Sequence, residues 1–155
     1  MDKTSLSRVA LMHPLLRTEL TNILSEIEQG GVSIRLTQTL RTIQEQNDLY
    51  AIGRTKPGRI VTNAKGGSSM HNFGMAVDFC LLHKDGTASW NMHEDLDKDG
   101  IADWMEVVKV FKKYGWKWGG DFLTFKDTPH FEKTFGKSLK DLQNCKKDSK
   151  GYPII

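Results

Sequence analysis

Cysteine is scarce in this chain of 155 residues, which contains Cys80 and Cys145 alone. Two cysteines are too few for a Cys-rich zinc module or a disulfide framework, so we interpret both as free thiols, with Cys80 buried. Long apolar runs are also missing, and no stretch approaches the ~20 residues of a transmembrane helix. The start of the chain lacks the charged beginning and apolar stretch of a signal peptide. We therefore expect no membrane insertion and no signal peptide, for a protein made in the cytoplasm.

An excess of one charge is absent too, because 22 basic residues face 19 acidic ones and leave a formal charge of +3. Nucleic-acid binding usually shows a clustered basic face, whereas lysine and arginine are dispersed here, so we predict no nucleic-acid partner. The length and the 38% hydrophobic content predict a single domain over residues 1–155 with one core, and we expect a monomer.

Apolar spacing gives a coarse map of helices and strands. Spacings of three and four residues predict helices, and alternation predicts half-buried strands. Between them, Gly53 to Ser69 is rich in Gly, Lys and Thr and is typical of a long loop. The expected helices are 14–29, 42–52, 101–114 and 138–147, and the expected strands are 32–38, 76–82, 89–90, 116–118 and 130–132.

The stretch Ser69 to Phe79 carries an imidazole and a carboxylate on the two sides of a small-residue turn. If residues 72–74 form a turn and a strand follows, His71 and Asp78 can face each other. A carboxylate in an apolar strand is costly unless something positive meets it, and a metal ion would do so. His130, in a second polar stretch downstream, would supply a third ligand.

Two histidines and one carboxylate, with a fourth position left open, are what a catalytic zinc ion requires. Zinc lowers the pKa of water and polarises a carbonyl group, but a general base must still accept the proton. Asp127, three residues before His130, can reach that position. Glu132 is the competing base, or else a partner that orients His130. From spacing alone, ordinary loop histidines and a capping aspartate remain an alternative.

Three motifs resemble the zinc peptidoglycan peptidases of the D-alanyl-D-alanine carboxypeptidase family. They are Ser69-x-His71-x-x-Gly74-x-Ala76-x-Asp78, Trp118-Gly119-Gly120-Asp121 and Asp127-x-Pro129-His130-Phe131. Within the family, the chain is most similar to the L-alanyl-D-glutamate endopeptidases of phage endolysins and bacterial wall hydrolases. The segments Gln38–Thr42, Glu45–Gln46 and Leu49–Thr55 also resemble that branch.

The resemblance implies an α+β fold of the hedgehog/DD-peptidase type, with a small antiparallel sheet and helices packed on one side. It implies His71, Asp78 and His130 as zinc ligands and Asp127 as the base. It further implies that Arg41 stabilises the carbonyl oxygen as that atom becomes an oxyanion. A surface salt bridge is the structural alternative for Arg41.

Four more residues are candidates for contacting the substrate or supporting the site, namely Ser69, Gln46, Trp118 and Glu132. The glycines after Trp118 let the backbone approach the cleft. Ser69 could instead cap its own turn.

The resemblance leaves the cleaved bond less certain than the metal. The dipeptidase and carboxypeptidase branches resemble one another in having Glu where this chain has Asp127. We therefore predict an L-Ala-D-Glu endopeptidase acting on peptidoglycan stem peptides at the cell wall, by an unknown export route. The alternatives are a D,D-carboxypeptidase on the same site and a non-catalytic, zinc-binding wall-recognition module.

An independent acidic motif runs from Asp95 to Glu106 and matches the calcium loop of EF-hands at positions 1, 3, 5, 6, 9 and 12. Two features depart from the pattern, because Ala102 replaces a larger apolar residue and no clear helix enters the loop. We predict a solitary calcium loop, structural or regulatory, inserted at 95–106. A solvated acidic turn that caps the next helix is the alternative. The predicted calcium ligands are Asp95, Asp97, Asp99, Ile101, Asp103 and Glu106.

Overall fold

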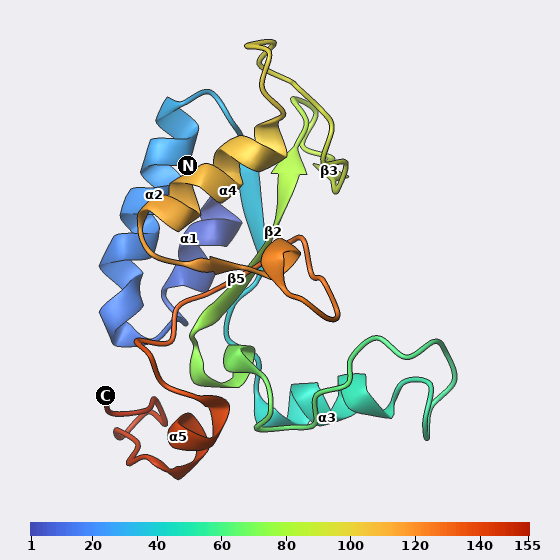
Figure 1. Cartoon of the computed structure of the whole chain (residues 1–155), viewed down its shortest axis with the longest axis vertical. Coiled ribbons are helices and arrows are strands. Elements are labelled where there is room, and N and C mark those ends of the chain that lie inside the picture. The colour runs from blue at the N-terminus through green and yellow to red at the C-terminus, as the bar shows by residue number, and fades with distance from the viewer.

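The computed structural model describes residues 1–155, in which three of the helices, α1, α2 and α4, gather on one side of an antiparallel sheet (Figure 1). The α-helices are α1 (Lys3–Val9), α2 (Arg17–Gln29), α3 (Ile43–Ala51), α4 (Asp103–Lys113) and α5 (Leu139–Asn144). The strands are β1 (Ile34–Gln38), β2 (Ala76–Leu82), β3 (Ala88–Ser89), β4 (Lys117–Trp118) and β5 (His130–Glu132). Three short 3₁₀ helices are η1 (Pro14–Leu16), η2 (Met70–Phe73) and η3 (Gly119–Asp121).

The helices form near the ranges that the apolar spacing and the capping residues predict, with three differences. Helix α5 ends at Asn144 and not at Lys147, since Cys145 has an extended backbone. Helix α1 was not expected, and it forms because the Asp2 carboxylate accepts a hydrogen bond from the Ser5 amide at its first turn. Helix α4 begins at Asp103 and not at Ile101, since Ala102 has an extended backbone. Thr42 caps α3 as expected, by accepting from the Glu45 amide at 3.0 Å.

The sheet has the order β1-β2-β5-β4, with β3 added beside β2, and every pair is antiparallel. This arrangement confirms the predicted α+β class. The register of β2 against β5 places Asp78 directly opposite His130. Residues directly opposite one another in adjacent strands have their side chains on the same face, so the pairing brings two candidate ligands together.

One face of the sheet is buried under α2 and α4. Phe131 of β5 stacks on Phe111 of α4, with ring centroids 4.0 Å apart, and Phe79 of β2 packs on Trp104 at 4.3 Å. All four rings are fully buried, and burying each stabilises the fold by about 1.5–3 kcal/mol. Because side chains alternate along a strand, Asp78 and His130 project from the face opposite this core.

Helix α3 and the loop that follows it extend away from the body as an arm (Figure 1). Both cysteines are free, and Cys80 is buried, as predicted. None of the helices combines the length and apolar character needed to cross a bilayer.

Candidate metal centre

His71 lies on η2, where the sequence predicted only a turn over residues 72–74. Ser69 caps this helix by accepting from the His71 amide, and Gly74 ends it in the left-handed conformation, with φ of 68°. The buried ring of His71 donates from Nδ1 to the Thr39 carbonyl at 2.8 Å. This bond fixes the tautomer and leaves Nε2 free to act as a ligand.

Asp78 lies between the two histidines. Its Oδ1 is 3.3 Å from Nε2 of His71 and 3.1 Å from Nδ1 of His130. The other ring nitrogen of His130, Nε2, donates to Oε1 of Glu132 at 2.9 Å. Each imidazole therefore has one nitrogen held by an oxygen acceptor and one directed at the Asp78 carboxylate.

The protonation of this cluster follows from its burial and its hydrogen bonds. Burial alone would raise the pKa of Asp78, but the hydrogen bonds from His130 and His71 outweigh it and hold the pKa well below the usual range. Burial would lower the pKa of His130, yet its bonds to Asp78 and Glu132 raise that pKa to about 9. Without a metal, the protonated imidazole of His130 supplies the positive charge that the carboxylate requires.

The cluster fits a metal ion in that role. Ligand atoms of His71, Asp78 and His130 all lie within 4.8 Å of one another. Two imidazoles and one carboxylate are a donor set typical of catalytic zinc, and an oxygen acceptor on the second nitrogen of each imidazole is typical of metal-ligating histidine. These three residues could hold zinc, and Glu132 could orient His130.

Asp127 borders the cluster, with Oδ2 3.8 Å from Nδ1 of His130 and a side chain that is 51% exposed. Burial of its inner part and the charge of Asp78 raise the pKa of Asp127 above the ordinary range. Its amide donates to the Gly119 carbonyl, and any Cβ at Gly119 would lie 2.1 Å from the Asp127 carbonyl oxygen. Glycine is therefore required at position 119 to place Asp127.

Two tryptophans hold the turn between Asp127 and His130. The indoles of Trp118 and Trp104 both donate to the Thr128 carbonyl, at 2.7 and 3.3 Å. Both rings are buried, so Trp118 lies behind the turn. Trp118, which the sequence predicted to lie near the cleft, therefore contacts this turn through its indole nitrogen.

Arg41 follows β1 and is tied to the same cluster. Its amide donates to the His71 carbonyl at 3.0 Å, and its Nη1 donates to Oε1 of Gln46 at 2.9 Å. Burial lowers the pKa of Arg41, and the carboxylates of Asp78 and Asp127 oppose that shift. The guanidinium of Arg41 makes no salt bridge. The alternative interpretation of Arg41 as a partner in a surface salt bridge is therefore not seen.

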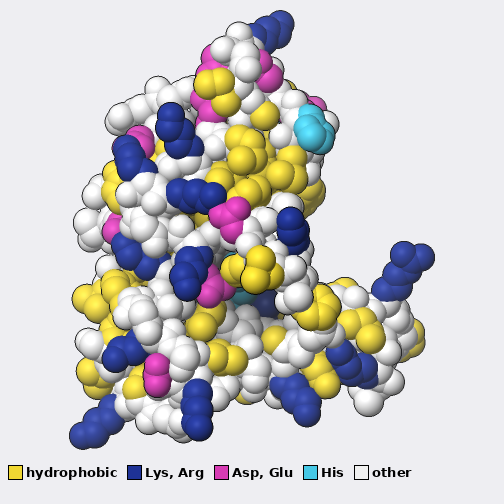
Figure 2. All heavy atoms as spheres, viewed as in Figure 1, with side chains coloured by type: hydrophobic (Ala, Val, Ile, Leu, Met, Phe, Trp, Pro, Cys, Tyr) yellow, Lys and Arg dark blue, Asp and Glu magenta, His cyan; other side chains and the backbone are white.

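An open groove of about 660 Å³ lies beside Asp127, between the arm and the loop before β5. In Figure 2 the surface is hollowed between the arm and the body, and Lys and Arg side chains gather on the arm. Exposed apolar side chains line both walls, with Ile60 and Val61 on the arm and Phe125 opposite. A groove that is open to solvent and has apolar side chains on both walls can accept an extended peptide chain.

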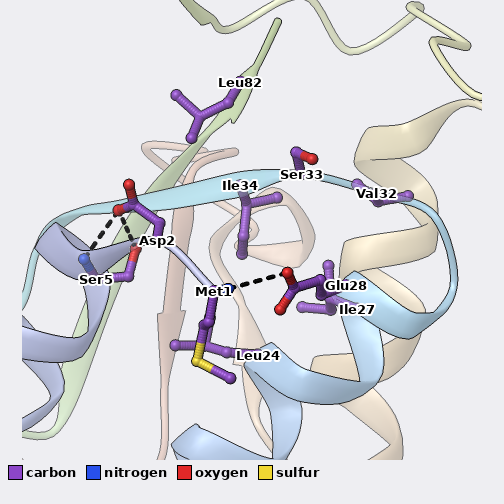
Figure 3. A pocket seen from close by; sticks show the side chains of 10 residues that line it. All are labelled: Met1, Asp2, Ser5, Leu24, Ile27, Glu28, Val32, Ser33, Ile34 and Leu82. Carbon is purple, nitrogen blue, oxygen red and sulfur yellow. Dashed lines mark hydrogen bonds and ion pairs between the residues drawn. The ribbon is translucent and has the colours of Figure 1, made fainter. Parts of the chain in front are cut away.

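A separate cavity lies among α1, α2 and β1 (Figure 3). The side chain of Met1 lies within it, and the amino group of Met1 pairs with Glu28 at 3.0 Å. Leu24, Ile27 and Ile34 line it, and none of the candidate site residues does. It is therefore distinct from the metal centre.

The acidic loop brings its carboxylates together in two overlapping groups that share Asp97. One also contains Asp95 and Asp99, and the other Asp103 and Glu106. Burial and the charges of its neighbours raise the pKa of Glu106 to about 7, and one of its oxygens is buried without a partner. The N-cap residue of α4 is Ala102, whose side chain makes no hydrogen bond. This argues against the alternative interpretation of the loop as an acidic turn that caps α4.

Sequence reasoning did not identify the contacts that support the candidate site residues. Thr39 and Thr128 act through carbonyl oxygens, which every residue type carries, so no motif could identify them. Trp104 is fully buried, and its indole donates to a carbonyl 24 positions away in the sequence, which no local pattern indicates. Ser69 caps η2, as its structural alternative proposed.

Comparison with known proteins identifies the family of this chain. The profile of the family described as D-alanyl-D-alanine carboxypeptidase matches residues 62–133. The chain is 43% identical over 121 residues to the peptidoglycan L-alanyl-D-glutamate endopeptidase CwlK of Bacillus subtilis, covering 78% of this chain and 72% of CwlK. It is 28% identical over 127 residues to the L-alanyl-D-glutamate peptidase of Listeria phage A118, covering 77% of this chain and 40% of that protein.

The fold agrees with a solved structure. The L-Ala D-Glu endopeptidase ChiX of Serratia marcescens superposes with a TM-score of 0.57 at 23% identity, over 87% of this chain and 90% of ChiX. The likeness to CwlK in sequence and to ChiX in fold points the same way as the metal-binding geometry. This chain belongs to the D-alanyl-D-alanine carboxypeptidase family of zinc-dependent peptidases, in the group of the L-alanyl-D-glutamate endopeptidases.

Proposed function

We propose that this chain hydrolyses the bond between L-Ala and D-Glu in the stem peptide of peptidoglycan, and that it acts at the cell wall. The observation that carries the proposal is the convergence of His71, Asp78 and His130, with Asp127 and Arg41 at the border of the same cluster. The names of CwlK and of the phage relative support the choice of bond.

We infer that His71, Asp78 and His130 hold the zinc ion. When bound, zinc supplies Lewis acidity, which polarises the substrate carbonyl and makes water easier to deprotonate. Asp127 accepts the proton as water attacks the carbonyl carbon, because its partly exposed carboxylate faces both the groove and His130. The same group returns the proton to the amine nitrogen as the carbon–nitrogen bond breaks.

Arg41 donates N–H groups to the oxygen that becomes negative in the transition state. Its side chain uses one donor on Gln46, and its Nε is buried without a partner. A fixed guanidinium stabilises developing charge without reorganising, and losing one such donor typically lowers kcat by about 10²–10³. Glu132 has the supporting role, since it accepts from His130 on the nitrogen that faces away from Asp78.

Metal removal and a base variant test this function together. Dialysis against a zinc chelator is expected to stop the clearing of a peptidoglycan suspension, and zinc is expected to restore it. Asp127→Asn should keep its zinc and its melting temperature and clear nothing. Clearing by the zinc-free protein or by Asp127→Asn would contradict the assignment, and a wild-type protein that holds zinc without clearing would favour the wall-recognition module.

We also propose that the loop 95–106 binds one calcium ion through Asp95, Asp97, Asp99, Asp103, Glu106 and the Ile101 carbonyl. Support comes from the shared position of Asp97 in both carboxylate groups and from the unpartnered oxygen of Glu106. Carboxylates packed so closely repel one another unless a cation lies among them.

Thermal unfolding tests the calcium proposal. Calcium at about 100 times its Kd stabilises the folded state by about 2.7 kcal/mol, which corresponds to about 5–10 °C in a domain of this size. Asp97→Ala should abolish that rise, and Asp48→Ala, on the exposed face of α3, should retain it. Equal melting temperatures with calcium and with chelator would count against the site.

A further inference from the structure

Gln46 is a fully buried amide in an otherwise exposed part of α3. Its neighbours Gln44, Glu45 and Asn47 are exposed, and Ile43 is 55% exposed. An apolar residue would be the usual occupant of a buried position, because an amide loses its bonds to water there. The burial of Gln46 therefore calls for partners that use its polarity.

Both ends of the Gln46 amide have such partners. Its Oε1 accepts from Nη1 of Arg41 at 2.9 Å, and its Nε2 donates to the Ala64 carbonyl at 2.8 Å. Ala64 lies in the arm loop and lines the groove together with Val61 and Thr62. One side chain thus joins the guanidinium to the groove wall.

The bond to Gln46 is the one hydrogen bond that the Arg41 side chain makes. The backbone of Arg41 is held separately, by the His71 carbonyl at its amide and by the Asn72 side chain at its carbonyl. A long side chain with a fixed backbone still rotates about its own bonds. Gln46 is therefore the one hydrogen-bonding partner in the protein that selects the orientation of the guanidinium.

We propose that Gln46 is a positioning residue, which aims the Arg41 guanidinium at the scissile carbonyl and couples its orientation to the Ile60–Ala64 wall of the groove. A stem peptide seated against that wall then fixes Ala64, and through Gln46 it fixes Arg41. This inference rests on the proposed function, because it assigns Arg41 to the reacting carbonyl.

Kinetics of Gln46→Met test the inference, because methionine is close in size to glutamine and can make neither hydrogen bond. On a soluble muropeptide, kcat is expected to fall about tenfold or more, while zinc content and melting temperature stay at the wild-type level. Gln44→Met is the matched control on the exposed face of the same helix and should keep its kcat. An unchanged kcat in Gln46→Met would overturn the proposal, as would a fall in kcat matched by an equal loss of zinc in a folded protein.

Gln46→Glu separates the two ends of the amide and serves if Gln46→Met does not fold. The carboxylate keeps an acceptor for Arg41 and loses the donor for Ala64. We expect kcat to stay within about threefold and KM to rise several-fold, because the wall is no longer tied to the guanidinium. An unchanged KM would contradict the coupling. A wild-type protein that does not cleave the muropeptide would instead refute the proposed function itself.

Discussion

Substituting Glu132 by glutamine distinguishes its two possible roles, as the general base or as the group that orients His130. The bond from Nε2 of His130 to Oε1 of Glu132 is 2.9 Å long, and the carboxylate is only 17% exposed. A buried hydrogen bond to a charged group contributes about 1.5–3 kcal/mol, against about 0.5–1.5 kcal/mol for a neutral one. Glutamine keeps an acceptor oxygen and loses the charge, so the difference is about 1–1.5 kcal/mol.

That difference predicts zinc binding about tenfold weaker in Glu132→Gln, which agrees with the usual effect of removing a partner of a ligating histidine. Competition with a chromogenic zinc chelator measures the affinity. The kcat at saturating zinc should remain within about tenfold of the wild-type value. Unchanged zinc affinity with a kcat at least 10²-fold lower would refute this reasoning and identify Glu132 as the base.

Two further predictions concern the supports of the site and of the fold. Trp118→Phe removes the 2.7 Å bond to Thr128 while keeping an aromatic ring, so kcat should fall several-fold with zinc affinity little changed; equal kcat in a steady-state assay would contradict the role of this bond. The hydrogen bond and charge of Arg35 hold the pKa of Asp2 at about 2, so Asp2 stabilises the fold fully above pH 4 and loses that contribution as the pH falls to 2. Asp2→Asn should therefore cost about 1 kcal/mol at pH 7 and almost nothing near pH 2 in urea unfolding, after allowance for solvent screening. A cost that does not change with pH would contradict it.

Much of the fold was predictable because local patterns and tertiary structure agree. The apolar spacing in α2 and the capping of α3 by Thr42 are readable from sequence, and both form as predicted. Helix α1 was missed because it is short, and its stability comes from contacts across the chain, such as the bonds from Arg35 to the Asp2 cap. Tertiary contacts of this kind leave no periodic signal.

The candidate zinc ligands were predictable because the motifs that contain them resemble those of a known zinc peptidase family, whereas spacing alone left ordinary loop histidines as an alternative. Their convergence depends on strand register, which places Asp78 against His130 and which no single sequence reveals. The sequence left Glu132 either as the general base or as the partner that orients His130. The contact of Glu132 with Nε2 of His130, which the structure shows, favours the second role.

The structure also shows how the acidic loop adjoins the site. Trp104 follows Asp103 in α4, and its indole donates to the carbonyl of Thr128, the residue after Asp127. The predicted calcium ligand Asp103 is therefore adjacent in sequence to the residue that contacts the turn after Asp127.

The measurement that tests the central claim most directly is mass spectrometry of purified peptidoglycan after digestion by the zinc-loaded protein. The proposed endopeptidase is expected to leave L-Ala attached to the glycan and to release stem fragments that begin with D-Glu. Loss of the terminal D-Ala alone, with intact L-Ala-D-Glu bonds, would contradict that claim and assign the site to a D,D-carboxypeptidase.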